Sequence, residues 1–312
     1  MEAIYRSLTD VVEAVGPAVA QLIVRPTGFE EYLEACPRGL GSGVIFDERG
    51  YILTNHHIVR GSRSVGVVLP DGRSYQGEVL GGDRRCDIAL VHIPGGELPV
   101  APLDHSAQPK AGEIAIAIGN ALGPEIGPTV SVGVISARAR PVREPGGGVI
   151  NGLLQTDASI NPGNSGGPLV TLNGGIVGIS TDAIPSRQGV GFAVGAGTAR
   201  AVFDAVLSSG HVARPWLGII AIAANPALAA NLGLTPKTGA LVVQIEDDSS
   251  AYFANIQAGD IIVSMDGAPV ASSADIQREI THRRVGDKVH LAIWRGGKEM
   301  ALAVGLKELP LH

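Results

Sequence analysis

The sequence of 312 residues is poor in cysteine, in aromatic side chains and in clustered positive charge. Its two cysteines, Cys36 and Cys86, can form at most one disulfide, which excludes a disulfide-stapled scaffold. The net charge is −6 without a large Lys or Arg cluster, which argues against a nucleic-acid partner. No apolar run approaches the about 20 residues that span a bilayer, and no basic region with a following hydrophobic stretch marks a secretory signal. We therefore expect a globular chain without a transmembrane segment, which is either cytoplasmic or has had a targeting segment removed.

Apolar residues and glycine are abundant instead. Apolar side chains make up 45% of the chain and glycine contributes 43 residues, and this length allows two or three domains with real cores. From Ala18 to Val194, short β-branched runs alternate with turn signals, which is typical of an all-β barrel or sandwich. Residues 1–16 carry apolar side chains at helical spacing. We therefore expect an N-terminal amphipathic segment and then a β domain over residues 17–210.

A second, smaller module follows the boundary at Arg214 and Pro215. Residues 211–214 are the predicted linker, and residues 215–308 combine strand-like runs with a helix that starts at Ser272. Ser272 and a carboxylate three residues later have the spacing of a capping box. This pattern predicts a compact α+β domain.

A glycine-rich turn around Ser165 indicates a nucleophile. Residues 163–167 read GNSGG, and glycine permits backbone angles that are closed to other residues. Amide groups in such a turn can converge on an oxyanion that forms beside the hydroxyl. We therefore predict an oxyanion hole from Gly163, Asn164 and Ser165.

A serine needs a base and a third group that holds the base in the right tautomer. His57 lies in the segment TNHHIV after an apolar run, and Asp87 begins the segment DIALV, which starts another apolar run. The order along the chain is His, Asp, Ser. This order is the chymotrypsin order and differs from those of subtilisin and of the α/β-hydrolases.

Three other interpretations of these motifs are weaker. GNSGG also satisfies the nucleophile elbow of α/β-hydrolases, but an elbow needs a strand before the serine and a helix after it, and strand-like runs follow Ser165. The glycines of residues 39–43 lack the following helix that a phosphate loop requires, so we expect close backbone approach there. His56 and His57 are adjacent and would point to opposite faces of a strand, without further ligands at metal spacing. We predict no metal and no cofactor.

These residues together resemble the HtrA (Deg) serine proteases, in which a chymotrypsin-like domain precedes a PDZ domain. The segments TNHHIV, DIAL and GNSGGPL carry the resemblance, which covers nearly the whole chain. It implies a double six-stranded β-barrel over residues 17–210, a small α+β PDZ domain over residues 215–308, and the catalytic triad His57, Asp87 and Ser165.

The resemblance also implies a peptide site in the second domain. The run Trp216, Leu217, Gly218 and Ile219 is similar to a PDZ carboxylate-binding loop, although tyrosine is commoner at its first position. The helix that follows Ser272 contributes two residues to the predicted peptide site, Ile276 and Ile280. Asn255 stands where the family has glycine, and asparagine tolerates left-handed backbone angles. Peptide C-termini are therefore the expected ligands, added as a strand beside the loop.

Substrate contacts follow from the same resemblance. The residue six before the nucleophile lies at the floor of the specificity pocket in chymotrypsin-like folds, and this residue is Ser159. Without an acid there, Lys and Arg are disfavoured, and Ile160 is expected to narrow the pocket toward small or medium aliphatic side chains. The backbone of Ser180 and Thr181 is the expected edge for pairing with substrate main chain, which suits unfolded proteins.

Assembly and location are expectations of the resemblance as well. Family members form trimers or multiples of trimers through the N-terminal segment, here with Ile4 and Tyr5, the alternative being that this helix packs on its own barrel. Residues 144–148 are the expected mobile activation loop. The resemblance implies the periplasm or cell envelope, with the cytoplasm as the alternative.

Two functions of different class remain open, and a third is weaker. The first is an endopeptidase of unfolded or damaged proteins under PDZ control, and the second is a peptide-binding chaperone or scaffold with little proteolysis. The intact set of His57, Asp87 and Ser165 favours the first. An esterase of the α/β-hydrolase class would act on small esters without proteolysis.

Overall fold

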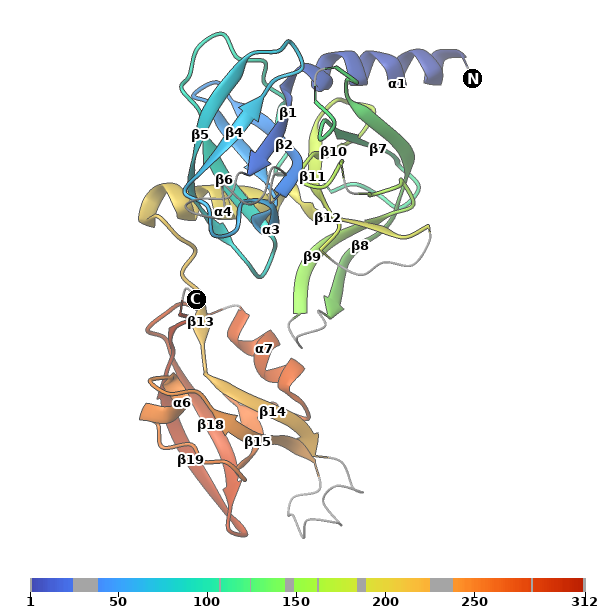
Figure 1. Cartoon of the computed structure of the whole chain (residues 1–312). Coiled ribbons are helices and arrows are strands. Elements are labelled where there is room, and N and C mark those ends of the chain that lie inside the picture. The colour runs from blue at the N-terminus through green and yellow to red at the C-terminus, as the bar shows by residue number, and fades with distance from the viewer. Residues whose placement is uncertain are drawn as a thin grey trace. The chain divides into compact units, whose positions relative to one another are not determined.

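The computed structural model describes residues 2–24, 39–106, 108–123, 125–143, 149–161, 163–183, 189–224, 238–281 and 283–310. The chain divides into two compact units, Met1–Val212 and Ala213–His312 (Figure 1). Cys36, the predicted activation loop at 144–148 and the side chains of Ile4 and Tyr5 lie outside the described residues.

The first unit begins with a closed antiparallel barrel in the strand order β1-β2-β3-β6-β5-β4. Its strands are β1 (Val19–Val24), β2 (Gly39–Asp47), β3 (Tyr51–Thr54), β4 (Ser64–Val68), β5 (Ser74–Asp83) and β6 (Ile88–His92). The hairpin between β4 and β5 turns at Asp71-Gly72, where Gly72 has a φ of 88°. A one-turn helix, α3 (His56–Val59), follows β3. Our placement of His56 and His57 on a strand was therefore wrong, because the chain turns directly after Thr54.

A second closed barrel completes this unit, in the order β10-β11-β12-β9-β8-β7. Its strands are β7 (Ile114–Gly119), β8 (Thr129–Arg143), β9 (Val149–Thr156), β10 (Pro168–Val170), β11 (Ile176–Thr181) and β12 (Gly191–Gly195). Helix α4 (Ala196–Ser209) ends at Gly210, whose left-handed backbone lets its N–H donate to the Val206 carbonyl. The predicted double six-stranded barrel is confirmed.

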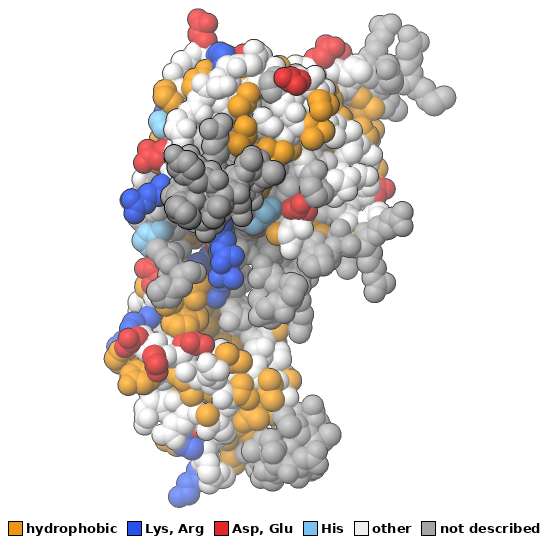
Figure 2. All heavy atoms as spheres, in the orientation of Figure 1, with side chains coloured by type: hydrophobic (Ala, Val, Ile, Leu, Met, Phe, Trp, Pro, Cys, Tyr) orange, Lys and Arg blue, Asp and Glu red, His pale blue; other side chains and the backbone are white. Residues whose placement is uncertain are grey.

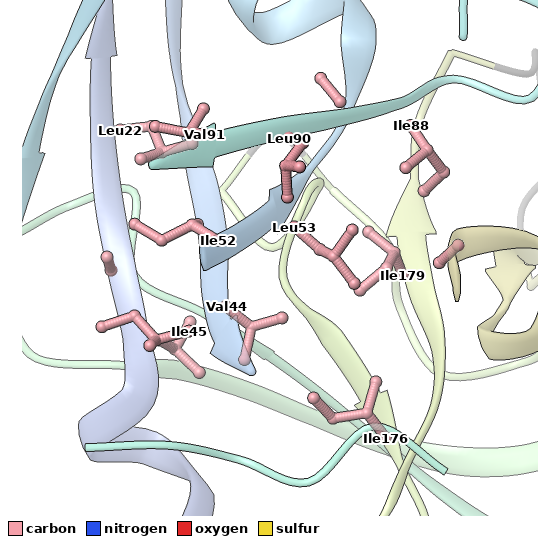
Figure 3. Close-up of a cluster of buried hydrophobic side chains, with 14 of the residues drawn as sticks. Leu22, Val44, Ile45, Ile52, Leu53, Ile88, Leu90, Val91, Ile176 and Ile179 are labelled. Atoms are coloured by element: carbon pink, nitrogen blue, oxygen red, sulfur yellow. The ribbon is translucent and has the colours of Figure 1, made fainter. Parts of the chain in front are cut away.

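One hydrophobic core joins the two barrels and lies directly behind the predicted catalytic segments. Leu53 of β3, Ile88 of β6 and Ile179 of β11 are all fully buried in it. Figure 3 shows Leu53 beside Ile179, so the first barrel packs on the second at this point. Each of these residues stands within a few positions of a predicted site residue. The core therefore fixes the segments that carry the site.

The N-terminal helix α1 (Glu2–Val15) continues into a short 3-10 turn, Gly16–Ala18. Val11 and Val15 are buried in the joint core of the barrels, and Leu8 and Val12 pack against it. The second half of α1 therefore packs on its own unit.

The second unit is an α+β domain built on an antiparallel sheet in the order β14-β15-β16-β18-β19. Its elements are β13 (Pro215–Trp216), β14 (Ile219–Ala224), β15 (Gly239–Ile245), α6 (Ser250–Phe253), β16 (Ile261–Met265), β17 (Ala268–Pro269), α7 (Ser273–Thr281), β18 (Lys288–Arg295), β19 (Lys298–Gly305) and β20 (Lys307–Glu308). Strand β14 is at one end of the sheet and contacts helix α7. Hydrophobic side chains reach the surface of both units (Figure 2).

Two local predictions for this domain concern the backbone of Asn255 and the capping box at Ser272. Asn255 has a φ of 55°, so it adopts the left-handed conformation that its family position requires. Asp275 Oδ2 accepts hydrogen bonds from Ser272 N at 2.9 Å and from Ser272 Oγ at 3.0 Å. The Ser272 hydroxyl therefore donates to Asp275 rather than capping an amide, and only half of the capping box forms.

Replacing Leu53 by alanine should destabilise the first unit by about 2–5 kcal/mol, because it removes a fully buried side chain and leaves a cavity. Leu207→Ala is the matched control, since Leu207 on α4 is 41% exposed. We expect this control to lie within about 0.5 kcal/mol of the parent chain. Calorimetric unfolding of the full chain measures both, and equal losses in the two variants would contradict the assignment of the core.

Candidate active site

His57 is held by Asp87 through both its ring and its backbone. His57 Nδ1 lies 2.8 Å from Asp87 Oδ2, and His57 N donates to Asp87 Oδ1 at 2.9 Å. The carboxylate therefore fixes the first turn of α3 as well as the orientation of the imidazole. A proton on Nδ1 satisfies this contact, as a general base of this type requires.

Asp87 has a φ of 57°, a left-handed backbone that is uncommon outside glycine. Such a conformation persists only where the surroundings hold it. Here the main-chain carbonyl of Asp87 accepts from Asn55 Nδ2 at 3.0 Å, and its carboxylate accepts from Thr181 Oγ1 at 2.6 Å. We expected Thr181 to offer its backbone to a substrate, and its hydroxyl contact with the acid was not foreseen from the sequence.

Ser165 lies in a loop that is bound to the first barrel through Ser42. The amide of Ser42 donates to the Ser165 carbonyl at 3.0 Å, and the Ser42 hydroxyl donates to the Gly163 carbonyl at 2.6 Å. Gly166 has a φ of 82°, and a Cβ there would lie 2.1 Å from the Ser42 carbonyl oxygen. Position 166 therefore requires glycine, because the backbone of β2 at Ser42 lies too close for a side chain there. A Cβ on Gly41 would lie 2.4 Å from Ile58 Cδ1, and one on Gly43 would lie 2.7 Å from Ile52 Cγ2. These two glycines therefore make room mainly for side chains, where we had predicted backbone, and the role of the Ser42 hydroxyl was missed.

Asp182, directly after β11, stands between the nucleophile and the base. Its Oδ1 lies 2.8 Å from Ser165 Oγ and 3.2 Å from His57 Nε2. Ser165 Oγ also lies 2.7 Å from Asn55 Oδ1. Within the described part of the chain, Ser165 Oγ makes no hydrogen bond with His57. The three predicted triad residues are thus neighbours, with an additional carboxylate among them.

The two carboxylates control the protonation of His57. Burial alone would lower the pKa of His57, but hydrogen bonds to Asp182 and Asp87 outweigh it and raise the pKa to about 9. The hydrogen bond from His57 in turn lowers the pKa of Asp182. Burial lowers the pKa of the adjacent His56. At neutral pH this arrangement therefore pairs a His57 cation with an ionised Asp182.

The amides of the turn divide into free and engaged groups. In the stretch 163–183, the N–H groups of Gly163 and Ser165 donate to no described acceptor, and Gly163 has a φ of 131°. The Asn164 N–H instead donates to the Asn161 carbonyl at 3.1 Å, and Asn164 Nδ2 donates to the Ser159 carbonyl at 2.8 Å. Asn164 therefore serves the shape of the loop, whereas the amides of Gly163 and Ser165 are left without a described acceptor, as the predicted oxyanion hole requires of its donors.

The predicted pocket residues lie together on this loop. Ser159 is exposed, and Ile160 is partly buried against the second barrel. A Cβ on Gly191 would lie 2.6 Å from Ile160 Cγ1, so the isoleucine side chain sits directly over that glycine.

Ser180 does not offer the free edge that we expected. Its N–H donates to the Gly167 carbonyl and its carbonyl accepts from Gly166 N, both at 2.9 Å. Its hydroxyl is buried without a hydrogen-bond partner among the described residues. Ser180 is therefore a structural residue of β11.

The residues of the predicted peptide site divide between a tight turn before β14 and the core of the second unit. Gly218 has a φ of 79°, and a Cβ there would lie 2.0 Å from Ser249 Cβ. Leu217 is buried, while Trp216 and Ile219 are partly buried on β13 and β14. Ile276 and Ile280 are each 2% exposed and belong to the core of this unit. They pack α7 onto the core of this unit and present little surface to a ligand.

Among the described residues, no group of three or more His, Cys, Asp or Glu side chains is arranged to hold a metal ion. None of the described helices combines the length and hydropathy needed to cross a membrane.

Comparison with known proteins decides the family. Residues 41–179 match the trypsin-like peptidase domain, and residues 215–306 match the PDZ domain. A probable periplasmic serine endoprotease, DegP-like, of Pseudomonas putida (strain GB-1) is 33% identical over 339 residues, which cover 97% of this chain and 70% of the relative. The chain belongs to the HtrA (DegP-like) serine protease family.

Two solved HtrA-type structures cover almost the whole chain. The HtrA-type protease AlgW, solved with a decapeptide, has a TM-score of 0.79 at 30% identity, over 97% of this chain and 98% of that chain. A serine endoprotease from Yersinia pestis has a TM-score of 0.77 at 32% identity over the same shares. These matches confirm the predicted architecture of a chymotrypsin-like domain followed by one PDZ domain.

This HtrA-type chain is shorter than several curated relatives. It covers 66% of the putative serine protease HhoB of a Synechocystis species at 38% identity, and 57% of a probable periplasmic DegP-like endoprotease of Pseudomonas fulva at 37% identity. The chain thus spans about two thirds or less of the length of these two relatives.

Gly218→Ala should destabilise the second unit by about 3 kcal/mol or more, because it adds a clash with Ser249 to the left-handed strain. Gly286→Ala is the matched control, since Gly286 has a φ of 92° with open space at its Cβ. The control should cost about 1–2 kcal/mol of backbone strain. Both tryptophans, Trp216 and Trp294, belong to this unit, so tryptophan fluorescence during urea unfolding of the full chain reports on it. Equal losses would contradict the tight contact at Gly218.

Proposed function

We propose that this HtrA-type chain is a serine endopeptidase in which His57, Asp87 and Ser165 carry out acyl transfer. The observation that supports it most strongly is the contact between Asp87 and His57 Nδ1 beside the Ser165 turn on a chymotrypsin-like fold. His57 Nε2 takes the hydroxyl proton as Ser165 Oγ attacks the peptide carbonyl. The amides of Gly163 and Ser165 stabilise the oxyanion, and His57 then gives the proton to the leaving amine. Water activated by His57 hydrolyses the acyl-enzyme.

Asp87 orients the imidazole and stabilises its cation during both steps. Thr181 Oγ1 donates to the Asp87 carboxylate and holds it toward the ring. We infer that Thr181 is a positioning residue of the site. Its contribution comes through the acid and not through contact with substrate.

The substrate preference follows from the surface beside Ser165. We propose that small or medium aliphatic side chains occupy the pocket formed at Ser159, Ile160 and Gly191. The absence of an acid at Ser159 disfavours Lys and Arg, because a buried cation needs a partner. Unfolded or damaged proteins are the proposed substrates, since their extended segments are free to pair as strands.

The second unit is proposed to bind peptide C-termini. Strand β14 is the edge strand of the sheet and contacts α7, so a peptide can add as a further strand along it. Gly218, with its left-handed backbone, directly precedes β14. Ile220 and Ile222 on β14 are exposed. We propose residues 17–210 as the protease domain, residues 211–214 as the linker and residues 215–308 as the regulatory or substrate-capturing PDZ domain.

Ser165→Ala should abolish labelling by a fluorophosphonate probe, because the probe reacts with an activated serine hydroxyl. The full chain should take up label and digest casein, while the variant should do neither and should unfold like the parent. Ser208→Ala is the control, since Ser208 lies on α4 and its hydroxyl donates to the Ala205 carbonyl of the same helix. Peptide binding without labelling of the full chain would favour the chaperone alternative. Turnover of small esters without casein digestion would favour the esterase alternative.

The assembly is proposed to be a trimer or a multiple of trimers built through the first residues of α1. Deletion of residues 1–6 should reduce the particle mass to that of a single chain, while the packed half of α1 with Val11 and Val15 stays in place. Light scattering of the full and shortened chains measures this. An unchanged number of subunits would contradict the role of these residues. The periplasm or cell envelope is the proposed location, since several relatives carry the word periplasmic in their names.

A further inference from the structure

The proposed mechanism gives no role to Asp182, although its carboxylate contacts both the nucleophile and the base. It follows β11, the strand whose Thr181 holds the catalytic acid, and its side chain is 30% exposed. Its carboxylate contacts both Ser165 Oγ and His57 Nε2 through the same oxygen. Its main-chain N–H lies 3.2 Å from Ser165 Oγ. The residue therefore contacts the nucleophile through both its carboxylate and its main-chain amide.

The hydrogen-bond donors of the site show what this contact does. Asn55 Nδ2 donates to the Asp87 carbonyl, which leaves Asn55 Oδ1 as an acceptor toward Ser165. Asp182 Oδ1 is an acceptor too, so the single proton of the Ser165 hydroxyl goes to one of these two oxygens. Neither arrangement directs it toward His57.

Each of the two ring nitrogens of His57 lies beside a carboxylate. Asp87 faces Nδ1 and Asp182 faces Nε2, and a carboxylate accepts only from a protonated nitrogen. Among the described residues, Asp87 and Asp182 are the charged groups that face this ring, while Asn55, Thr181 and Ser165 around them are neutral. A ring with protons on both nitrogens cannot take the proton of Ser165.

We propose that Asp182 is a positioning residue that holds Ser165 and His57 apart in the substrate-free enzyme, and that its carboxylate must leave Nε2 before the hydroxyl attacks. The proposal rests on the proposed serine-protease function. The partial exposure of Asp182 gives its side chain a route into solvent when a substrate reaches Ser165. Asp182 thus keeps the unoccupied site inactive and sets the pH at which the base becomes available.

The pH dependence follows from the sign of the His57 shift. Hydrogen bonds to Asp182 and Asp87 keep His57 protonated until the pH rises through about 9, so the neutral base is scarce at pH 7. Asp182→Asn removes one carboxylate and retains the shape of the side chain, which should lower the midpoint. Each pH unit of that decrease raises the base fraction at pH 7 about tenfold.

The test is the rate of fluorophosphonate labelling between pH 5 and pH 10 for the full chain and the variants Asp182→Asn and Asp182→Ala. Asp204→Asn is the control, since Asp204 pairs with Arg200 on α4 and is 57% exposed. We expect both Asp182 variants to shift the midpoint down by at least about one unit and to label at least about tenfold faster at pH 7. The control should keep the parent profile.

Two results would overturn the proposal. A parent-like pH profile in the Asp182 variants would show that the carboxylate does not govern His57. Loss of labelling in variants with parent-like thermal unfolding would show that Asp182 takes part in the reaction. If the parent chain labels at no pH, the proposed function itself fails, and this outcome is distinct from failure of the Asp182 inference alone.

Discussion

The packing of the two barrels on each other is the constraint on which the candidate site depends. Asp87 and His57 come from the first barrel, whereas Ser165 and Asp182 come from the second. The joint core buries side chains beside each of these segments, and Ser42 binds the nucleophile loop to β2 through both its amide and its hydroxyl. A shift of one barrel would therefore separate the acid and base from the nucleophile. Stability and catalytic geometry have the same physical origin here.

The same packing explains why, among the described residues, Ser165 Oγ lies near His57 without a hydrogen bond to it. The barrels bring Ser165 within reach of the base, but they also bring Asp182 to Nε2. An imidazole between two carboxylates is stabilised as a cation, which suits the transition state but hinders the first proton transfer. In the substrate-free site, His57 is therefore already in the protonated state that it would reach only after accepting the proton of Ser165.

Sequence alone identified the features that are local in the chain. The barrels followed from short β-branched runs and turns, and the predicted triad followed from three short segments in the right order. Ser42, Asp182 and the hydroxyl of Thr181 were missed, because each acts on a residue far away in the chain. An aspartate after a strand is an ordinary surface residue until the second barrel places it beside His57. Ile276 and Ile280 were misassigned for a related reason, since a helical stripe does not reveal whether it faces a core or a ligand.

An NMR titration of the His57 imidazole in the intact, substrate-free chain, with its signals assigned by their loss in His57→Gln, measures directly whether two carboxylates hold this ring as a cation. Because the ring lies between Asp87 and Asp182, we expect a titration midpoint of about 9. A midpoint at or below the ordinary histidine value of 6.5 would contradict it.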